Sequence, residues 1–223
     1  MPDGQYSFYL HSDDRTDIAA MATINTISQP LRGEFIRTAA TAGAVVYQVD
    51  ARLPALIPVF FAGQLSAVRL CAVMALVSGT WSSLTGLPDE PENGEAALPV
   101  SPETEYQRRR YTLTLQNGRS GERVESVLTE ASSRLRGDLL RNLIITGLAL
   151  HTTAPELPRL LASMPVPPTS VSELQALVQQ MAGTADVSRA AAAVPDTPAT
   201  SAVPVSGSDT REIKKNMRRA FGD

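Results

Sequence analysis

The chain has one cysteine, two histidines and few aromatic residues among its 223 positions. A lone Cys71 cannot form an internal disulfide bond, which is the pattern of a reducing compartment. The sequence contains no metal-ligand spacing and no glycine-rich phosphate loop, and His11 and His151 lie in non-equivalent places. These absences argue against an enzyme and predict neither a cofactor nor a metal.

A long uninterrupted apolar run is also missing. The most apolar region, 53–81, is broken by Pro54, Pro58, Gln64 and Arg69 before it reaches the roughly 20 residues that a membrane span requires. No basic-then-apolar leader opens the chain. With 43% hydrophobic residues, we expect a cytoplasmic protein that has one or two ordinary cores and no membrane contact.

The formal net charge of -3 argues against a uniformly basic nucleic-acid binder, but the charge is unevenly distributed. Acidic residues gather between positions 89 and 105, whereas Arg108, Arg109 and Arg110 stand together directly afterwards. A second basic cluster fills the C-terminal stretch from 211 to 219. Local basic surfaces therefore remain available for phosphate groups.

The sequence contains a long internal repeat. The run Leu31-Arg32-Gly33 returns 104 positions later as Leu135-Arg136-Gly137, and the correspondence continues through Gly43 and Gly147 and through a shared Leu-Pro step at 53 and 157. A repeat of this length is too long for a solenoid unit. We interpret each copy as a small domain-like unit, produced by duplication.

Each copy begins with a short alternation of apolar and polar residues, at 5–10 and at 110–115, which predicts a strand. The side chains expected to point away from the core are Gln5, Ser7 and Tyr9 in the first copy and Arg110, Thr112 and Thr114 in the second.

Two helices are expected to follow each strand. Val124, Val127, Leu128, Ala131 and Leu135 follow one helix face, and Ile18, Met21, Ile24 and Ile27 do so more loosely. The second helix begins at the Leu-Arg-Gly step, and its mid-helix glycine suggests a close crossing of two helices. Shorter helical pieces, at 53–79 and 157–183, complete each copy.

A strand with two helices is too small to bury its own apolar face, so it needs a partner. The pattern predicts a mainly α fold with short strands, in which tandem ribbon-helix-helix units form a pseudo-dimer. The expected boundaries are 5–81 for the first unit with its helical cap, 82–107 for an acidic linker, 108–183 for the second unit with its cap, 184–208 for a disordered linker and 209–223 for a basic amphipathic tail.

In the ribbon-helix-helix class the paired strands enter the DNA major groove and their outward side chains reach base edges. The six outward residues above are then candidates for reading bases. The start of the second helix suits a phosphate oxygen, which makes Arg32, Gly33, Arg136 and Gly137 candidate backbone contacts. The alternative is that the two arginines are solvated helix-start residues.

The C-terminal stretch carries Ile213, Met217 and Phe221 four residues apart, and Lys214, Lys215 and Arg218 lie between them. An isolated helix of this length is marginal in water, so the stretch is expected to fold against a partner groove. The alternative is a basic tail that holds DNA without sequence preference.

These residues, above all the strand, the segment from Leu31 to Ala44, the following Leu-Pro cap and the terminal stretch 208–217, resemble the ParR (StbB) adaptors of actin-type plasmid partition systems. The resemblance implies binding to centromere-like direct repeats in double-stranded DNA, self-association on that DNA, and capture of a filament of the actin-like ATPase ParM (StbA) by the tail. It also implies repression of the protein's own operon. The chain departs from the family pattern because it has two units rather than one.

Two other functions stay open at this point. The chain could be a ribbon-helix-helix repressor or antitoxin without a filament partner. It could also be a helical scaffold protein whose paired strands never contact DNA.

Overall fold

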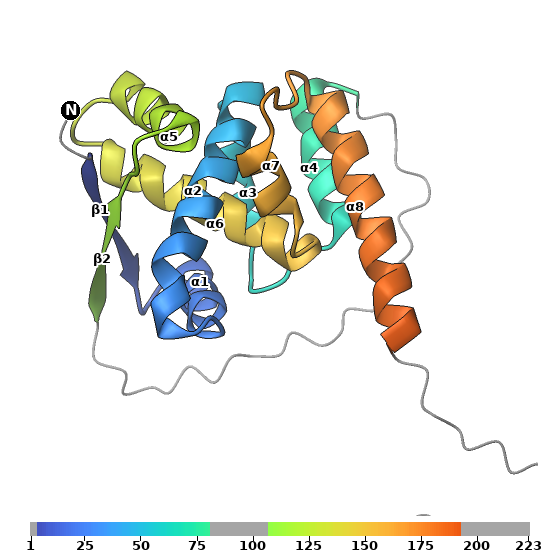
Figure 1. Cartoon of the computed structure of the whole chain (residues 1–223), viewed down its shortest axis with the longest axis horizontal. Helices are drawn as coiled ribbons and strands as arrows, with labels where there is room; N and C mark the ends of the chain where they lie inside the picture. Colours follow the sequence, from blue (N-terminus) through green and yellow to red (C-terminus); the bar gives the residue numbers. More distant parts are fainter. Residues whose placement is uncertain (1–3, 81–106, 193–223) are drawn as a thin grey trace, which may run out of the picture. The chain divides into compact units, whose positions relative to one another are not determined.

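The computed structural model describes residues 4–80 and 107–192, with side chains as far as Gly183. The first copy consists of β1 (Gln5–His11), α1 (Arg15–Asn25), a 3-10 turn (Gln29–Leu31), α2 (Arg32–Val49), α3 (Leu53–Phe60) and α4 (Ala67–Ser78). The second copy consists of β2 (Arg108–Thr114), α5 (Arg119–Glu130), α6 (Arg136–Thr153), α7 (Leu157–Ser163) and α8 (Val171–Ala192). The order of one strand, two helices and two cap helices is therefore the same in both copies (Figure 1).

The two strands pair with each other and form one antiparallel ribbon (Figure 1). Ser7 lies opposite Thr112 at the centre of the ribbon. These two residues hold equivalent positions in the repeats, so a pseudo-two-fold axis passes between them. The two copies thus pair within a single chain.

The second helices of the two copies, α2 and α6, cross at the centre of the core. A Cβ atom at Gly43 would overlap the main-chain carbonyl of Leu143, and a Cβ atom at Gly147 would overlap that of Ala39. These two contacts are equivalent under the duplication. The close crossing that the sequence indicated is confirmed, and only glycine allows it.

The cap helices are exchanged between the copies. Helix α3 packs on α6 and α7 packs on α2, so the cap of each copy covers the second helix of the other. The described residues up to Arg189, that is 4–80 and 107–189, belong to one compact unit. The expected fold class, mainly α with tandem strand-helix-helix units paired within the chain, is confirmed, and the two copies share one core.

The last helix is longer than the sequence suggested. Helix α8 continues to Ala192, whereas we expected a disordered linker to begin at position 184. The residues after Gly183 include several alanines, which have the highest helix propensity, so the helix extends through them. The remainder of that linker, the acidic linker at 82–107 except for residue 107, and the tail at 209–223 lie outside the described residues.

The first helix of the first copy buries a different face from the expected one. Of Ile18, Met21, Ile24 and Ile27, only Ile24 is fully buried, and the buried face also contains Asp17. In the second copy α5 buries the expected Val124, Val127 and Leu128. An acidic residue on the buried face explains why the apolar period of α1 is weak.

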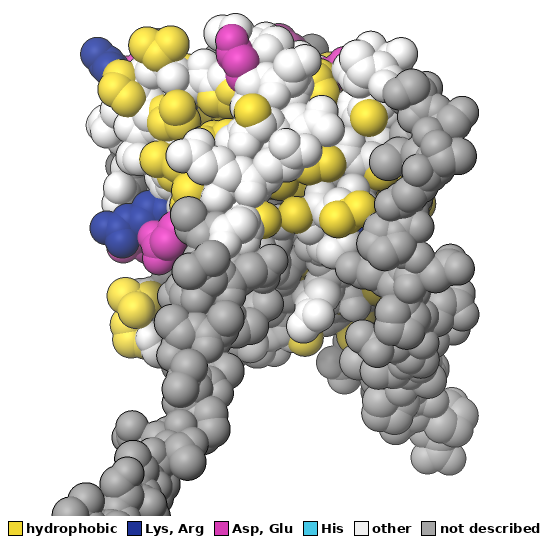
Figure 2. All heavy atoms as spheres, turned by 90° about the vertical axis from the view of Figure 1, so that its right-hand side faces the viewer, with side chains coloured by type: hydrophobic (Ala, Val, Ile, Leu, Met, Phe, Trp, Pro, Cys, Tyr) yellow, Lys and Arg dark blue, Asp and Glu magenta, His cyan; other side chains and the backbone are white. Residues whose placement is uncertain are grey.

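Most of the large exposed apolar side chains in the described residues lie on the cap helices of the first copy. The most exposed on helices α3 and α4 are Val59, Phe60, Val68 and Leu76. On the side that carries α4 and α8, apolar side chains lie scattered among polar ones (Figure 2). No helix within residues 4–80 and 107–192 has the length and apolar content to cross a membrane.

Candidate nucleic-acid interface

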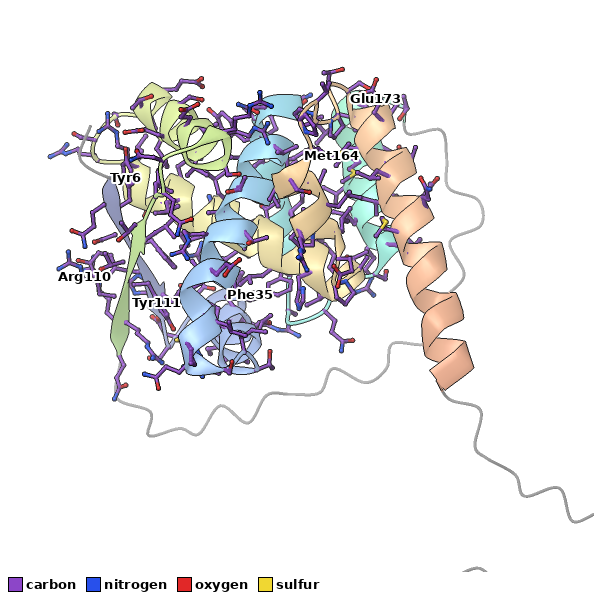
Figure 3. The ribbon with its side chains drawn as sticks, in the orientation of Figure 1. Tyr6, Phe35, Arg110, Tyr111, Met164 and Glu173 are labelled. Carbon is purple, nitrogen blue, oxygen red and sulfur yellow. The ribbon has the colours of Figure 1, made fainter. Side chains whose placement is uncertain are left out.

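The ribbon has one apolar face and one polar face. Phe8, Leu10 and Leu113 are buried against the helices, and the rings of Phe8 and Tyr111 stack with centroids 5.2 Å apart. This anchored face holds the strands in one register, so the opposite face is fixed in position. Figure 3 shows Tyr111 on the helix side of the ribbon and Arg110 on the side away from the helices.

The six predicted base-reading residues all lie on the polar face, in the register that the alternation implied. Gln5, Arg110, Thr112 and Thr114 are exposed, whereas Ser7 and Tyr9 are half-buried. The Arg110 guanidinium donates two hydrogen bonds to the Ser7 hydroxyl, with N···O distances of 3.2 and 3.0 Å. The arginine is therefore held across the ribbon near its centre, where its remaining N–H groups can reach a ligand.

One functional candidate on this face was missed from the sequence. Arg108 is exposed, and its guanidinium stacks 3.6 Å from the centre of the Tyr9 ring. Since it lies two residues before Arg110, the same alternation, continued by one step, could have found it. The polar face thus carries two arginines from the second copy.

The candidate arginines at the start of the second helices have a structural contact in both copies. The Arg32 Nε donates to the carbonyl of Ile27 at 2.8 Å, and the Arg136 Nε donates to the carbonyl of Ala131 at 3.2 Å. Each guanidinium closes the turn between the first and second helices. Because an arginine has five N–H donors, a phosphate contact by either residue stays a prediction.

The two glycines at these helix starts have different surroundings. A Cβ atom at Gly137 would lie 3.5 Å from the Ser7 carbonyl oxygen, so the first turn of α6 lies against the ribbon. A Cβ atom at Gly33 would lie 3.7 Å from a guanidinium nitrogen of Arg37 on its own helix. Backbone N–H groups at the start of α6 are therefore placed beside the strands, as a phosphate contact needs.

A buried carboxylate ties the end of the ribbon to the helices. Asp17 accepts a hydrogen bond from the His11 N–H at 2.9 Å, and it pairs with Arg141 of α6 at 2.6 Å. Asp14 also contacts Arg141, at 3.2 Å. Burial raises the pKa of the Asp17 carboxyl, and the hydrogen bonds from Arg141 and His11 oppose that rise. Nothing in the sequence pattern singled out this group.

The predicted partner-binding residues Ile213, Lys214, Lys215, Met217, Arg218 and Phe221 lie outside the described residues. The tail therefore stays a prediction from the sequence.

The geometry defines a class: a duplicated strand-helix-helix protein whose single ribbon presents a polar, arginine-bearing face to solvent. The family of plasmid stability proteins matches the chain twice, at residues 4–74 and 109–178, which together exceed half of its length. The chain belongs to this family, in a tandem form, and the two matches coincide with the two copies. No curated protein and no solved structure matches the chain.

Proposed function

We propose that this plasmid stability protein is a partition adaptor that binds centromere-like direct repeats in double-stranded DNA through the polar face of its ribbon. Its C-terminal tail then links the DNA to a filament of an actin-like ATPase of the ParM type. In this proposal the protein acts in the cytoplasm, on plasmid DNA, by binding and without catalysis. It also represses its own operon.

The observation that carries the proposal is the polar face of the ribbon. A two-stranded ribbon fits the major groove, which is about 12 Å wide. Arginine can make paired hydrogen bonds to guanine, and threonine can bond to several bases. The ribbon-helix-helix interpretation uses these residues together, with α2 and α6 supplying backbone amides to the flanking phosphates.

Replacing Arg110 and Thr112 with alanine should remove sequence preference. Each good bidentate base contact contributes about 1 to 3 kcal/mol, so we expect affinity for the specific site to fall by about 10- to 100-fold. Non-specific binding should change less. The measurement is a nuclease footprint over the DNA that flanks the gene, at near-physiological salt, where protection should recur over short direct repeats.

The matched control is Arg69→Ala, since Arg69 is an exposed arginine on α4, far along the chain from the ribbon. It should leave the footprint unchanged. If the unaltered protein protects no region of this DNA, the adaptor and the repressor are both excluded and the scaffold interpretation stands.

Deleting residues 209–223 separates the adaptor from a simple repressor or antitoxin. The adaptor should keep its footprint and lose plasmid segregation, because the tail supplies the filament contact. A repressor should keep both its footprint and its control of the operon, with no effect on segregation. The measurement is plasmid loss per generation beside the footprint of the shortened chain.

A further inference from the structure

The pseudo-two-fold axis relates two surface pockets, one at each end of the ribbon. The first has a volume of about 490 Å³ and lies between the start of α1 and helix α6. The second has a volume of about 240 Å³ and lies between the start of α5 and helix α2. Arg141 lines the first pocket and Arg37, its equivalent in the duplication, lines the second. The two pockets are therefore copies of one site.

In the first pocket the protein supplies its own anion. The Asp14 carboxylate accepts from the Asp17 N–H at 3.0 Å, which caps the start of α1, and it also contacts Arg141. Asp17 forms a second ion pair with Arg141. A carboxylate thus bridges a helix N-terminus and an arginine.

In the second pocket no carboxylate bridges the helix start and the arginine, since Glu122 in the first turn of α5 does not line the pocket. The N-cap residue of α5 is Gly118, which has no side chain to cap the helix, and the position equivalent to Asp17 is Gly121. Gly118 has a φ of +139°, a conformation that a residue with a side chain rarely adopts, so an aspartate cannot take its place. Within the described residues, Arg37 and Arg119 form no ion pair with an acidic side chain. Glu34 at the rim has an equivalent, Asp138, in the first pocket, so it does not account for the difference.

We propose that the second pocket binds a phosphate group, held by Arg37, Arg119 and the first backbone N–H groups of α5. The source is the DNA backbone. The lining includes Leu115 and Gln116, which directly continue β2, so the pocket lies where the backbone would pass beside a ribbon seated in the groove. The DNA source rests on the proposed function, whereas the phosphate chemistry does not.

The test uses the full chain and inorganic phosphate as the probe, followed by amide chemical shifts in NMR. Phosphate should shift the amides of residues 119–121 and leave those of residues 15–17 in place. The shifts should disappear in Arg37→Gln and should persist in the control Arg69→Gln. Absence of any phosphate-dependent shift at 119–121 overturns the proposal.

A second variant, Ser120→Asp, guards against a folding artefact. The change removes the hydrogen bond that the Ser120 hydroxyl donates to the Ala162 carbonyl at 3.3 Å, but an acidic residue in the first turn of a helix is favourable, so α5 should stay folded. The new carboxylate should nevertheless occupy the pocket and abolish the phosphate shifts. Retained phosphate binding in a folded Ser120→Asp protein contradicts the assigned position.

DNA affinity as a function of salt distinguishes the source of the phosphate. If the DNA backbone fills the pocket, Arg37→Gln should weaken DNA binding equally for all sequences. The slope of log affinity against log salt concentration should then fall in magnitude by about 1. If inorganic phosphate shifts the amides but Arg37→Gln leaves that slope unchanged, the pocket binds an anion, and the DNA backbone is excluded as its source. If the protein does not bind DNA at all, the proposed function fails, and the phosphate titration still decides the pocket.

Discussion

Replacing Gly147 with alanine is expected to lower the free energy of unfolding by about 3 kcal/mol, since a new methyl group meets main-chain atoms that cannot move aside. The added Cβ would overlap the carbonyl of Ala39 and force α2 and α6 apart. Gly43→Ala should have a similar effect, because its contact with Leu143 is the equivalent one. Urea unfolding followed by circular dichroism measures both.

Gly183→Ala is the matched control for these changes. Gly183 lies inside helix α8, and a Cβ there meets nothing within 4 Å. The substitution should stabilise the protein by up to about 1 kcal/mol, since alanine favours a helix over glycine by that amount. Equal effects at positions 147 and 183 would mean that helix propensity, and not the crossing, determines the result.

Arg141→Met should destabilise the protein at neutral pH by about 3 to 5 kcal/mol, because it leaves the buried Asp17 carboxylate without its partner. Asp17 has no exposed surface, whereas 21% of the Arg141 side chain is exposed, so the uncompensated acid is the costly member of the pair. Adding Asp17→Asn should restore part of the loss. A double variant less stable than Arg141→Met alone contradicts this explanation.

The same variant should respond to pH in a defined direction. The pKa of Asp17 is already raised by burial in the unaltered protein, and it should rise further without Arg141. A carboxyl with a raised folded-state pKa contributes stability that is complete below its unfolded value, near 3.8, and is lost as the pH rises through the folded value. Arg141→Met should therefore regain stability on acidification, relative to the double variant.

Much of the fold follows from local patterns that the duplication shows twice. The alternation of apolar and polar residues predicted which side chains of both strands face the helices. The paired glycines Gly43 and Gly147 predicted the helix crossing. These features depend on short-range periodicity and on steric limits that a sequence displays directly. The exchange of the cap helices could not be predicted, because either copy's α3-type helix is apolar enough to cover either second helix.

The candidate site was likewise predictable only where it depends on a local pattern. The six outward residues of the ribbon were found because strand alternation fixes their side. The group of Asp14, Asp17 and Arg141 was not, because its members come from different copies and an acidic residue on a helix normally faces solvent. The difference between the two pockets became visible only when the pseudo-two-fold axis showed which residues are equivalent.

Pairing within one chain has a consequence for the proposed binding to DNA. A ribbon made from two identical chains looks the same from either direction, and its stability depends on protein concentration. Here the two halves are covalently joined, so the ribbon should persist at any dilution, and each half can change its side chains independently. Gln5 and Tyr9 already differ from their counterparts Arg110 and Thr114. Such a ribbon has two different ends, so under the proposed function it should lie on each direct repeat in the same orientation.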